Sequence, residues 1–252
     1  MCKLKSAIIL KDKIFMPDYD SHSKMLEELK ITDDYINASK VFVRAELVPE
    51  NGDVFSDIDG WKFSVDQDIT PEWFDEKDCT ERMRKAVKEW AKTHIFIGQN
   101  GLKISHGENI FIKDCEDVDI CGNAMVESIY GNATVKNIYD KATVKSICGK
   151  ATVEYIYDNA TVESICDNAT VERIYGNATV ENICNNAKVE RICGNAKVER
   201  ICGNATVISY SYIKWNNSTS MVIDDNATFK DCYSKMIYQA GGWEFVKVTR
   251  GK

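Results

Sequence analysis

The sequence predicts a mainly β protein in which an N-terminal α+β domain is followed by a parallel β-solenoid and a C-terminal cap. Three observations lead to this fold class. Residues 122–211 are ten consecutive copies of one nine-residue unit, strand-like and helix-like patterns alternate before them, and aromatic residues are frequent after them. We therefore expect three segments, residues 1–105, 106–211 and 212–252.

The first segment begins with patterns typical of short strands and a short helix. Residues 7–10 and 13–16 predict a hairpin, and Ser21 can cap a helix that continues to Leu29. Residues 41–48 and 61–65 alternate apolar and polar side chains, as strands with one buried face do.

The best helix pattern of the chain follows in the same segment. Thr80 is expected to be its N-cap, and Met83, Val87, Trp90 and Ala91 fall on one face. Because an open solenoid end exposes unpaired backbone groups, we expect this domain also to cover one end of the repeats.

The repeat unit reads Gly/Asp/Asn, Asn/Lys, Ala, Thr/Lys, Val, two variable residues, Ile and Tyr/Cys, as in residues 176–184. Ala, Val and Ile in these positions predict a strand with one buried face, and the opening Gly, Asp or Asn suits a turn with positive φ. A helix is excluded, because Gly or Asp would recur in every second or third turn. Each unit should form one strand and one corner.

The ninth position of the unit indicates how many units complete one coil. It alternates between two rows of identical residues, Cys148, Cys166, Cys184 and Cys202 in one, and Tyr139, Tyr157 and Tyr175 in the other. Two units per turn give coils of 18 residues, about five of them, stacked about 4.8 Å apart. The spacing of the inward residues favours two faces of nine residues over three faces of six.

This unit resembles the short-period β-solenoid proteins as a class, close to nonapeptide β-rolls and, more distantly, to pentapeptide-repeat proteins. It matches neither motif, since the Asp row of calcium-binding rolls is missing and pentapeptide coils repeat every twenty residues. The layout of an α/β domain followed by such repeats is similar to uncharacterised proteins of gut bacteria and their phages. That resemblance implies no particular activity.

Composition restricts the partners. The formal net charge of −7 argues against binding along nucleic acid, which depends on Lys and Arg that neutralise phosphates. No stretch is long and apolar enough for a membrane span, and residues 1–10 do not fit a signal peptide. We expect a cytoplasmic protein whose ten cysteines stay reduced, because the repeating cysteines do not follow disulfide or zinc spacings.

Neither a cofactor nor a metal site is predicted. Asp57, Asp59 and Asp66 fall on positions of a calcium-binding EF-hand loop, but Phe55 occupies its first position, so a solvated turn is the better interpretation. The histidines, His22, His94 and His106, share no metal-ligand or nucleophile spacing with a cysteine or carboxylate. Catalytic residues are not assigned.

The outward positions of the solenoid and the aromatic tail are the remaining candidates for partner binding. Stacked glutamates would repel one another, and the arginines at the next position relieve this. A solvated surface of mixed charge is the simpler interpretation. The candidate residues are Glu172, Arg173, Glu190, Arg191 and Arg200 in the repeats, and Trp215, Tyr238 and Trp243 in the tail.

A rigid, regular solenoid suits binding better than turnover. We expect a non-enzymatic module that binds another protein, of the kind that a phage or mobile element uses to inhibit a host defence or nucleic-acid enzyme. Two alternatives stay open, an enzyme whose active site lies in residues 1–105 and a solenoid that mimics DNA. The basic residues among the repeats weaken the second alternative. Residues 212–252 could cap the solenoid or form a homodimer interface.

Overall fold

The computed structural model describes residues 5–209, 222–232, 236–241 and 244–249 of the 252-residue chain. The chain divides into two compact units, Met1–Ile95 and Phe96–Lys252. No helix of the described residues is long and apolar enough to cross a membrane.

The described part of the first unit contains an antiparallel sheet with the strand order β2-β1-β3-β4. Its strands are β1 (Lys5–Leu10), β2 (Ile14–Phe15), β3 (Phe42–Val48) and β4 (Lys62–Val65). Ile9 pairs with Ile14, which confirms the predicted hairpin, and the two other predicted strands pair with each other as β3 and β4.

Helices lie on both faces of this sheet. The elements are α1 (His22–Glu28), α2 (Tyr35–Ala38) and α3 (Glu76–His94), with 3-10 turns η1 (Glu50–Gly52) and η2 (Ile58–Gly60). Met25 and Leu26 of α1 cluster with Ile8 and Phe42 on one face. Trp90 of α3 lies under the Lys5 ammonium on the opposite face, 5.0 Å from ring centroid to nitrogen.

The two helix starts predicted from the sequence have different outcomes. Ser21 caps α1 by accepting a hydrogen bond from the Lys24 amide, as expected. Thr80 does not cap α3, because Asp75 accepts a hydrogen bond from the Asp78 amide and starts the helix five residues earlier. A carboxylate at this position satisfies an otherwise free amide and suits the positive end of the helix dipole.

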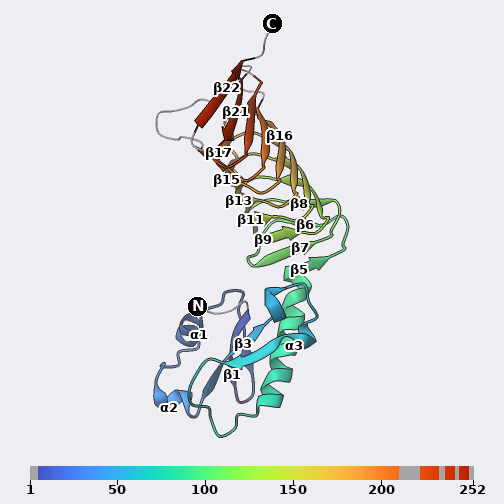
Figure 1. Ribbon diagram of the computed structural model, residues 1–252. Coiled ribbons are helices and arrows are strands. Elements are labelled where there is room, and N and C mark those ends of the chain that lie inside the picture. The colour runs from blue at the N-terminus through green and yellow to red at the C-terminus, as the bar shows by residue number, and fades with distance from the viewer. Residues whose placement is uncertain (1–4, 210–221, 233–235, 242–243, 250–252) are drawn as a thin grey trace. The chain divides into compact units, whose positions relative to one another are not determined.

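The second unit is a parallel β-solenoid of about seven turns in the described residues, from about residue 95 to 231. Its strands alternate between two sheets, as Figure 1 shows, which confirms two faces per 18-residue coil. The first sheet contains β6 (Lys103–Ile104), β8 (Val118–Ile120), β10 (Thr134–Ile138), β12 (Thr152–Ile156), β14 (Thr170–Ile174), β16 (Lys188–Ile192), β18 (Thr206–Ser209) and β20 (Thr228–Asp231). The second contains β5 (Ile95–Ile97), β7 (Ile110–Lys113), β9 (Met125–Tyr130), β11 (Thr143–Ile147), β13 (Thr161–Ile165), β15 (Thr179–Ile183), β17 (Lys197–Ile201) and β19 (Val222–Ile223).

The solenoid is longer than the ten recognisable copies indicate. Strands β5 to β8 already form parallel pairs before residue 122, for example between Ile104 and Ile120. Their buried residues join the same apolar core, whereas the Gly-Asn-Ala corner motif is not yet present in them. The apolar core therefore begins upstream of the sequence pattern.

The Ala, Val and Ile of each unit form one continuous core between the two sheets. Val162 and Ile165, for example, are fully buried, and each pairs in register with the same residue type one turn away. The residue that opens each unit has a positive φ, as predicted. At Gly203, with φ of 67°, an added Cβ would lie 2.7 Å from the Asn185 nitrogen.

The described part of the C-terminal segment continues this sheet and then reverses it. After β20, the strands β21 (Met236–Gly241) and β22 (Glu244–Thr249) add to the same sheet in antiparallel order. This antiparallel hairpin extends the edge of the first sheet beyond the last parallel strand.

The expectation that all ten cysteines stay reduced is wrong for one pair. Cys148 and Cys166 form a disulfide, with Cα atoms 4.9 Å apart. A separation of 18 residues is one full turn, so the parallel stack brings identical ladder positions within disulfide range. Cys184 and Cys202, further along the same row, are free.

The observed start of α3 gives a direct test. Asp75→Ala should lower the free energy of unfolding by about 1 kcal/mol, because it removes the side-chain cap. Thr80→Ala, the matched control, should change it little or raise it slightly, because alanine has the higher helix propensity. Urea unfolding followed by circular dichroism measures both, and equal effects would contradict the assignment of Asp75 as the cap.

Candidate functional site

A charged groove lies on the outer surface of the first solenoid sheet. It has a volume of about 310 Å³ and is formed by the outward positions of β14 and β16. Val and Ile of each strand are buried in the core, whereas the two residues between them are exposed or half-buried. The lining residues are Glu172, Arg173, Lys188, Glu190, Arg191 and Ile208.

The charges in this groove are arranged in rows. Arg173 pairs in register with Arg191, so the backbones of the two arginines lie one strand spacing apart, and Glu172 and Glu190 occupy the neighbouring row. Two contacts offset the repulsion within the rows. Lys188 forms an ion pair with Glu190 at 2.7 Å, and the Arg173 guanidinium lies 5.5 Å from the ring centroid of Tyr155.

Four of the eight residues predicted for partner binding thus line one groove. Arg200 lies on β17 of the other sheet, where it forms an ion pair with Asp224 at 2.8 Å. Tyr238 lies on β21, with its ring 6.0 Å from that of Phe229. Trp215 and Trp243 lie outside the described residues.

The opposite sheet carries a different outward row. Glu163, Glu181 and Glu199 occupy the same position of successive strands β13, β15 and β17. At the N-terminal end of this row, Lys145 of β11 forms an ion pair with Glu127 of β9 at 2.6 Å. Lys145 is therefore the residue that interrupts an otherwise acidic row.

The tyrosine ladder is closed to ligands that would stack on its rings. Tyr157 lies between Tyr139 and Tyr175, with centroids 5.2 and 5.0 Å apart and the rings nearly parallel. Each inner ring face is covered by a neighbouring ring. A hydrogen bond with Cys121 and burial raise the pKa of Tyr139 to about 12, and burial raises the pKa values of the other two rings.

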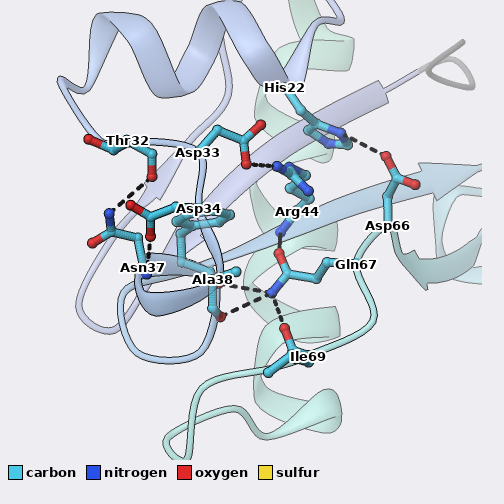
Figure 2. A network of polar contacts seen from close by, with 11 residues as sticks. His22, Thr32, Asp33, Asp34, Asn37, Ala38, Arg44, Asp66, Gln67 and Ile69 are labelled. Carbon is cyan, nitrogen blue, oxygen red and sulfur yellow. Dashed lines mark hydrogen bonds and ion pairs between the residues drawn. The ribbon is translucent and has the colours of Figure 1, made fainter.

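The first unit holds a second polar site, shown in Figure 2. An open pocket of about 470 Å³ lies beside α2 and the end of β4. Arg44 of β3 forms an ion pair with Asp33 at its edge. Its lining residues are Asp33, Asp34, Tyr35, Ala38, Arg44, Asp66, Gln67, Asp68 and Ile69.

Gln67 fixes the walls of this pocket. Its side-chain oxygen accepts a hydrogen bond from the Arg44 amide at 2.8 Å. Its side-chain nitrogen donates to the Ile69 carbonyl at 2.6 Å and to the Phe42 carbonyl at 3.1 Å (Figure 2). One amide therefore holds the segment after β4 against β3.

His22 brings two distant segments together beside this pocket. Its Nδ1 lies 3.2 Å from Asp66 Oδ2 (Figure 2), and its Nε2 lies 3.2 Å from the Ala45 carbonyl oxygen. Glu46 of β3 lies in the same cluster, with ligand atoms of all three residues within 4.8 Å of one another. No sequence spacing connects His22 to residues 24 and 44 positions away.

The carboxylates of the acidic turn, Asp57, Asp59 and Asp66, each contact a different partner. Asp57 caps η2 by accepting from the Asp59 amide at 3.1 Å, and Asp59 forms an ion pair with Lys88 at 2.6 Å. The hydrogen bond with Lys88 lowers the pKa of Asp59. Asp66 instead faces His22, so these carboxylates do not gather around one calcium ion.

Comparison with protein-family models, with curated proteins and with solved structures finds no match to this chain. The fold itself is a parallel β-solenoid with coils of about 18 residues.

The acidic row on the second sheet predicts a salt-dependent effect. Lys145→Glu would replace the ion pair with Glu127 by repulsion and should destabilise the protein by about 0.5–1 kcal/mol at low salt. Screening should reduce the loss at high salt. Lys150→Glu, an exposed corner substitution, is the control and should have little effect in urea unfolding. A loss that does not change with salt would contradict the electrostatic explanation.

The tyrosine ladder predicts alkaline destabilisation. Because the folded pKa of Tyr139 is raised from 10.0 to about 12, its contribution to stability is present below pH 10 and is lost as pH rises through 12. Ultraviolet titration should show a late tyrosinate transition that Tyr139→Phe reduces. Tyr35→Phe, which changes a tyrosine outside the ladder, should leave that transition in place.

Proposed function

We propose that this protein is a non-enzymatic module that binds another protein through the charged groove of β14 and β16. The observation that carries the proposal is the in-register arrangement of Glu172 and Arg173 above Glu190 and Arg191. This arrangement places rows of opposite charge side by side on a hydrogen-bonded sheet.

The sheet makes these side chains a preorganised surface. Arg173 and Arg191 project from strands whose Val and Ile residues are buried in the common core, so their backbone positions are fixed. Fixed positions lower the entropy that is lost when a partner binds. Arginine also forms paired hydrogen bonds with carboxylates, which makes it effective at protein interfaces.

The chemistry of the groove favours a protein over a nucleic acid or a small molecule. Glu172 and Glu190 would repel phosphates that Arg173 and Arg191 attract. The groove is shallow and largely polar, unlike the apolar pockets that enclose small ligands. A protein surface with acidic and basic side chains at strand spacing could complement both rows.

The proposal includes the partner class expected from the sequence, a host defence or nucleic-acid enzyme that the module inhibits. Rigid binding without substrate turnover is consistent with inhibition.

Capture experiments with the full chain test the groove. Bacterial lysate is passed over immobilised wild-type protein, and retained proteins are quantified by mass spectrometry. A specific partner should be lost with the double variant Arg173→Glu/Arg191→Glu, because reversing both charges turns the groove entirely acidic apart from Lys188.

Arg200→Glu is the matched control, because Arg200 lies on the other sheet of the same solenoid. It should retain the partner. Equal retention by the double variant and the wild type would refute the groove as the interface. Turnover of a nucleotide or peptide by the full chain in a broad activity screen would refute the non-enzymatic part.

A further inference from the structure

We propose that His22, Glu46 and Asp66 form a binding site for one divalent transition-metal ion in the first unit. The three residues come from three different elements, the first residue of α1, the centre of β3 and the segment directly after β4. This inference is independent of the solenoid groove and goes beyond the proposed function.

The orientation of the histidine is that of a metal ligand. The Ala45 carbonyl can only accept a hydrogen bond, so His22 Nε2, at 3.2 Å, carries the proton. In the neutral imidazole this leaves the lone pair on Nδ1, which faces Asp66 Oδ2 at 3.2 Å. Metal-binding histidines are commonly fixed in this way by a backbone carbonyl on the second nitrogen.

The contact between Nδ1 and Asp66 itself requires a cation. A lone pair and a carboxylate oxygen repel each other, so a proton or a metal ion must lie between them. The separation of 3.2 Å is that of two neighbouring ligand atoms around one ion, which are about 2.8–3.6 Å apart when each bond is about 2.0–2.2 Å long and the angle between the bonds is about 90–110°.

Glu46, the third ligand, completes a site that has two buried ligands and one exposed ligand. His22 and Glu46 are buried, 5 % and 9 % exposed, whereas the Asp66 side chain is 62 % exposed. All ligand atoms lie within 4.8 Å of one another, slightly more than one ion spans. Small side-chain rotations of the carboxylates would close this difference, and the exposed side of Asp66 leaves room for water as a further ligand.

The ligand set indicates the class of metal. One imidazole nitrogen suits zinc, iron and similar ions better than magnesium or calcium, which prefer oxygen ligands only. With a neutral histidine, the two carboxylates give the site a charge of −2, which balances the charge of a divalent ion.

Cobalt(II) is the probe for the test, with zinc(II) as a competitor. The full chain should bind one Co²⁺ with visible ligand-field bands and no thiolate charge-transfer band, and Zn²⁺ should displace it. The absence of the thiolate band matters because the free cysteines of the row, Cys184 and Cys202, can also bind cobalt. Mg²⁺ at the same concentration should not displace Co²⁺.

Asp66→Asn is the decisive variant, because its exposed side chain can be replaced without disturbing the core. It should weaken Co²⁺ binding about tenfold or more. His22→Gln, whose amide can still donate to the Ala45 carbonyl, should also weaken it. Asp68→Asn, a carboxylate of the same pocket outside the cluster, should bind as the wild type does.

Two outcomes would overturn the proposal. One is a wild-type protein that binds no Co²⁺, or only Co²⁺ with a thiolate band. The other is an Asp66→Asn variant that binds Co²⁺ as tightly as the wild type. In either case the contact between His22 and Asp66 is an ordinary ion pair of a protonated histidine.

Discussion

The solenoid depends on one constraint, that each strand pairs in parallel register with the strand 18 residues away. This pairing places every residue above its own counterpart in the repeat, as for Val144, Val162 and Val180. The backbone hydrogen bonds between turns, the apolar core and the corner residues with positive φ all follow from this pairing. A shift by one residue would turn the Val and Ile positions outward and remove the core.

Stacking identical residues on one another stabilises some kinds of side chain and destabilises others. It favours the apolar core, the stacked tyrosines and the corner asparagines, where the Asn204 amide donates to Asn186 at 3.1 Å. It opposes charged side chains, which then need partners outside their own row. Asp224 provides such a partner for Arg200, whereas Lys145 provides one for Glu127 by interrupting the acidic row itself. The surface chemistry of the solenoid is therefore decided by departures from the repeat.

Much of the fold could be predicted because these features are local. Period, corner residues and buried positions are all visible in one nine-residue unit. The solenoid strands before residue 106 could not be predicted, since they keep apolar residues but lack the corner motif. The disulfide was not predicted, although the 18-residue turn stacks Cys148 on Cys166, because the expectation of reduced cysteines was based on a cytoplasmic location. The site at His22, Glu46 and Asp66 has no local signal, because sheet pairing and helix packing alone bring its members together.

The two solenoid sheets differ at the seventh position of the unit, which varies between copies. This difference supports the proposal that the charged groove of β14 and β16 is the binding surface. The seventh position of the unit carries Ser128, Ser146, Ser164 and Asn182 before Arg200 on one sheet. On the other it carries Asn137, then Tyr155, Arg173 and Arg191. Because the buried positions are the same on both sides, core packing does not require this asymmetry. Large side chains that can contact a partner thus gather on one sheet, above a backbone that both sheets hold equally rigid.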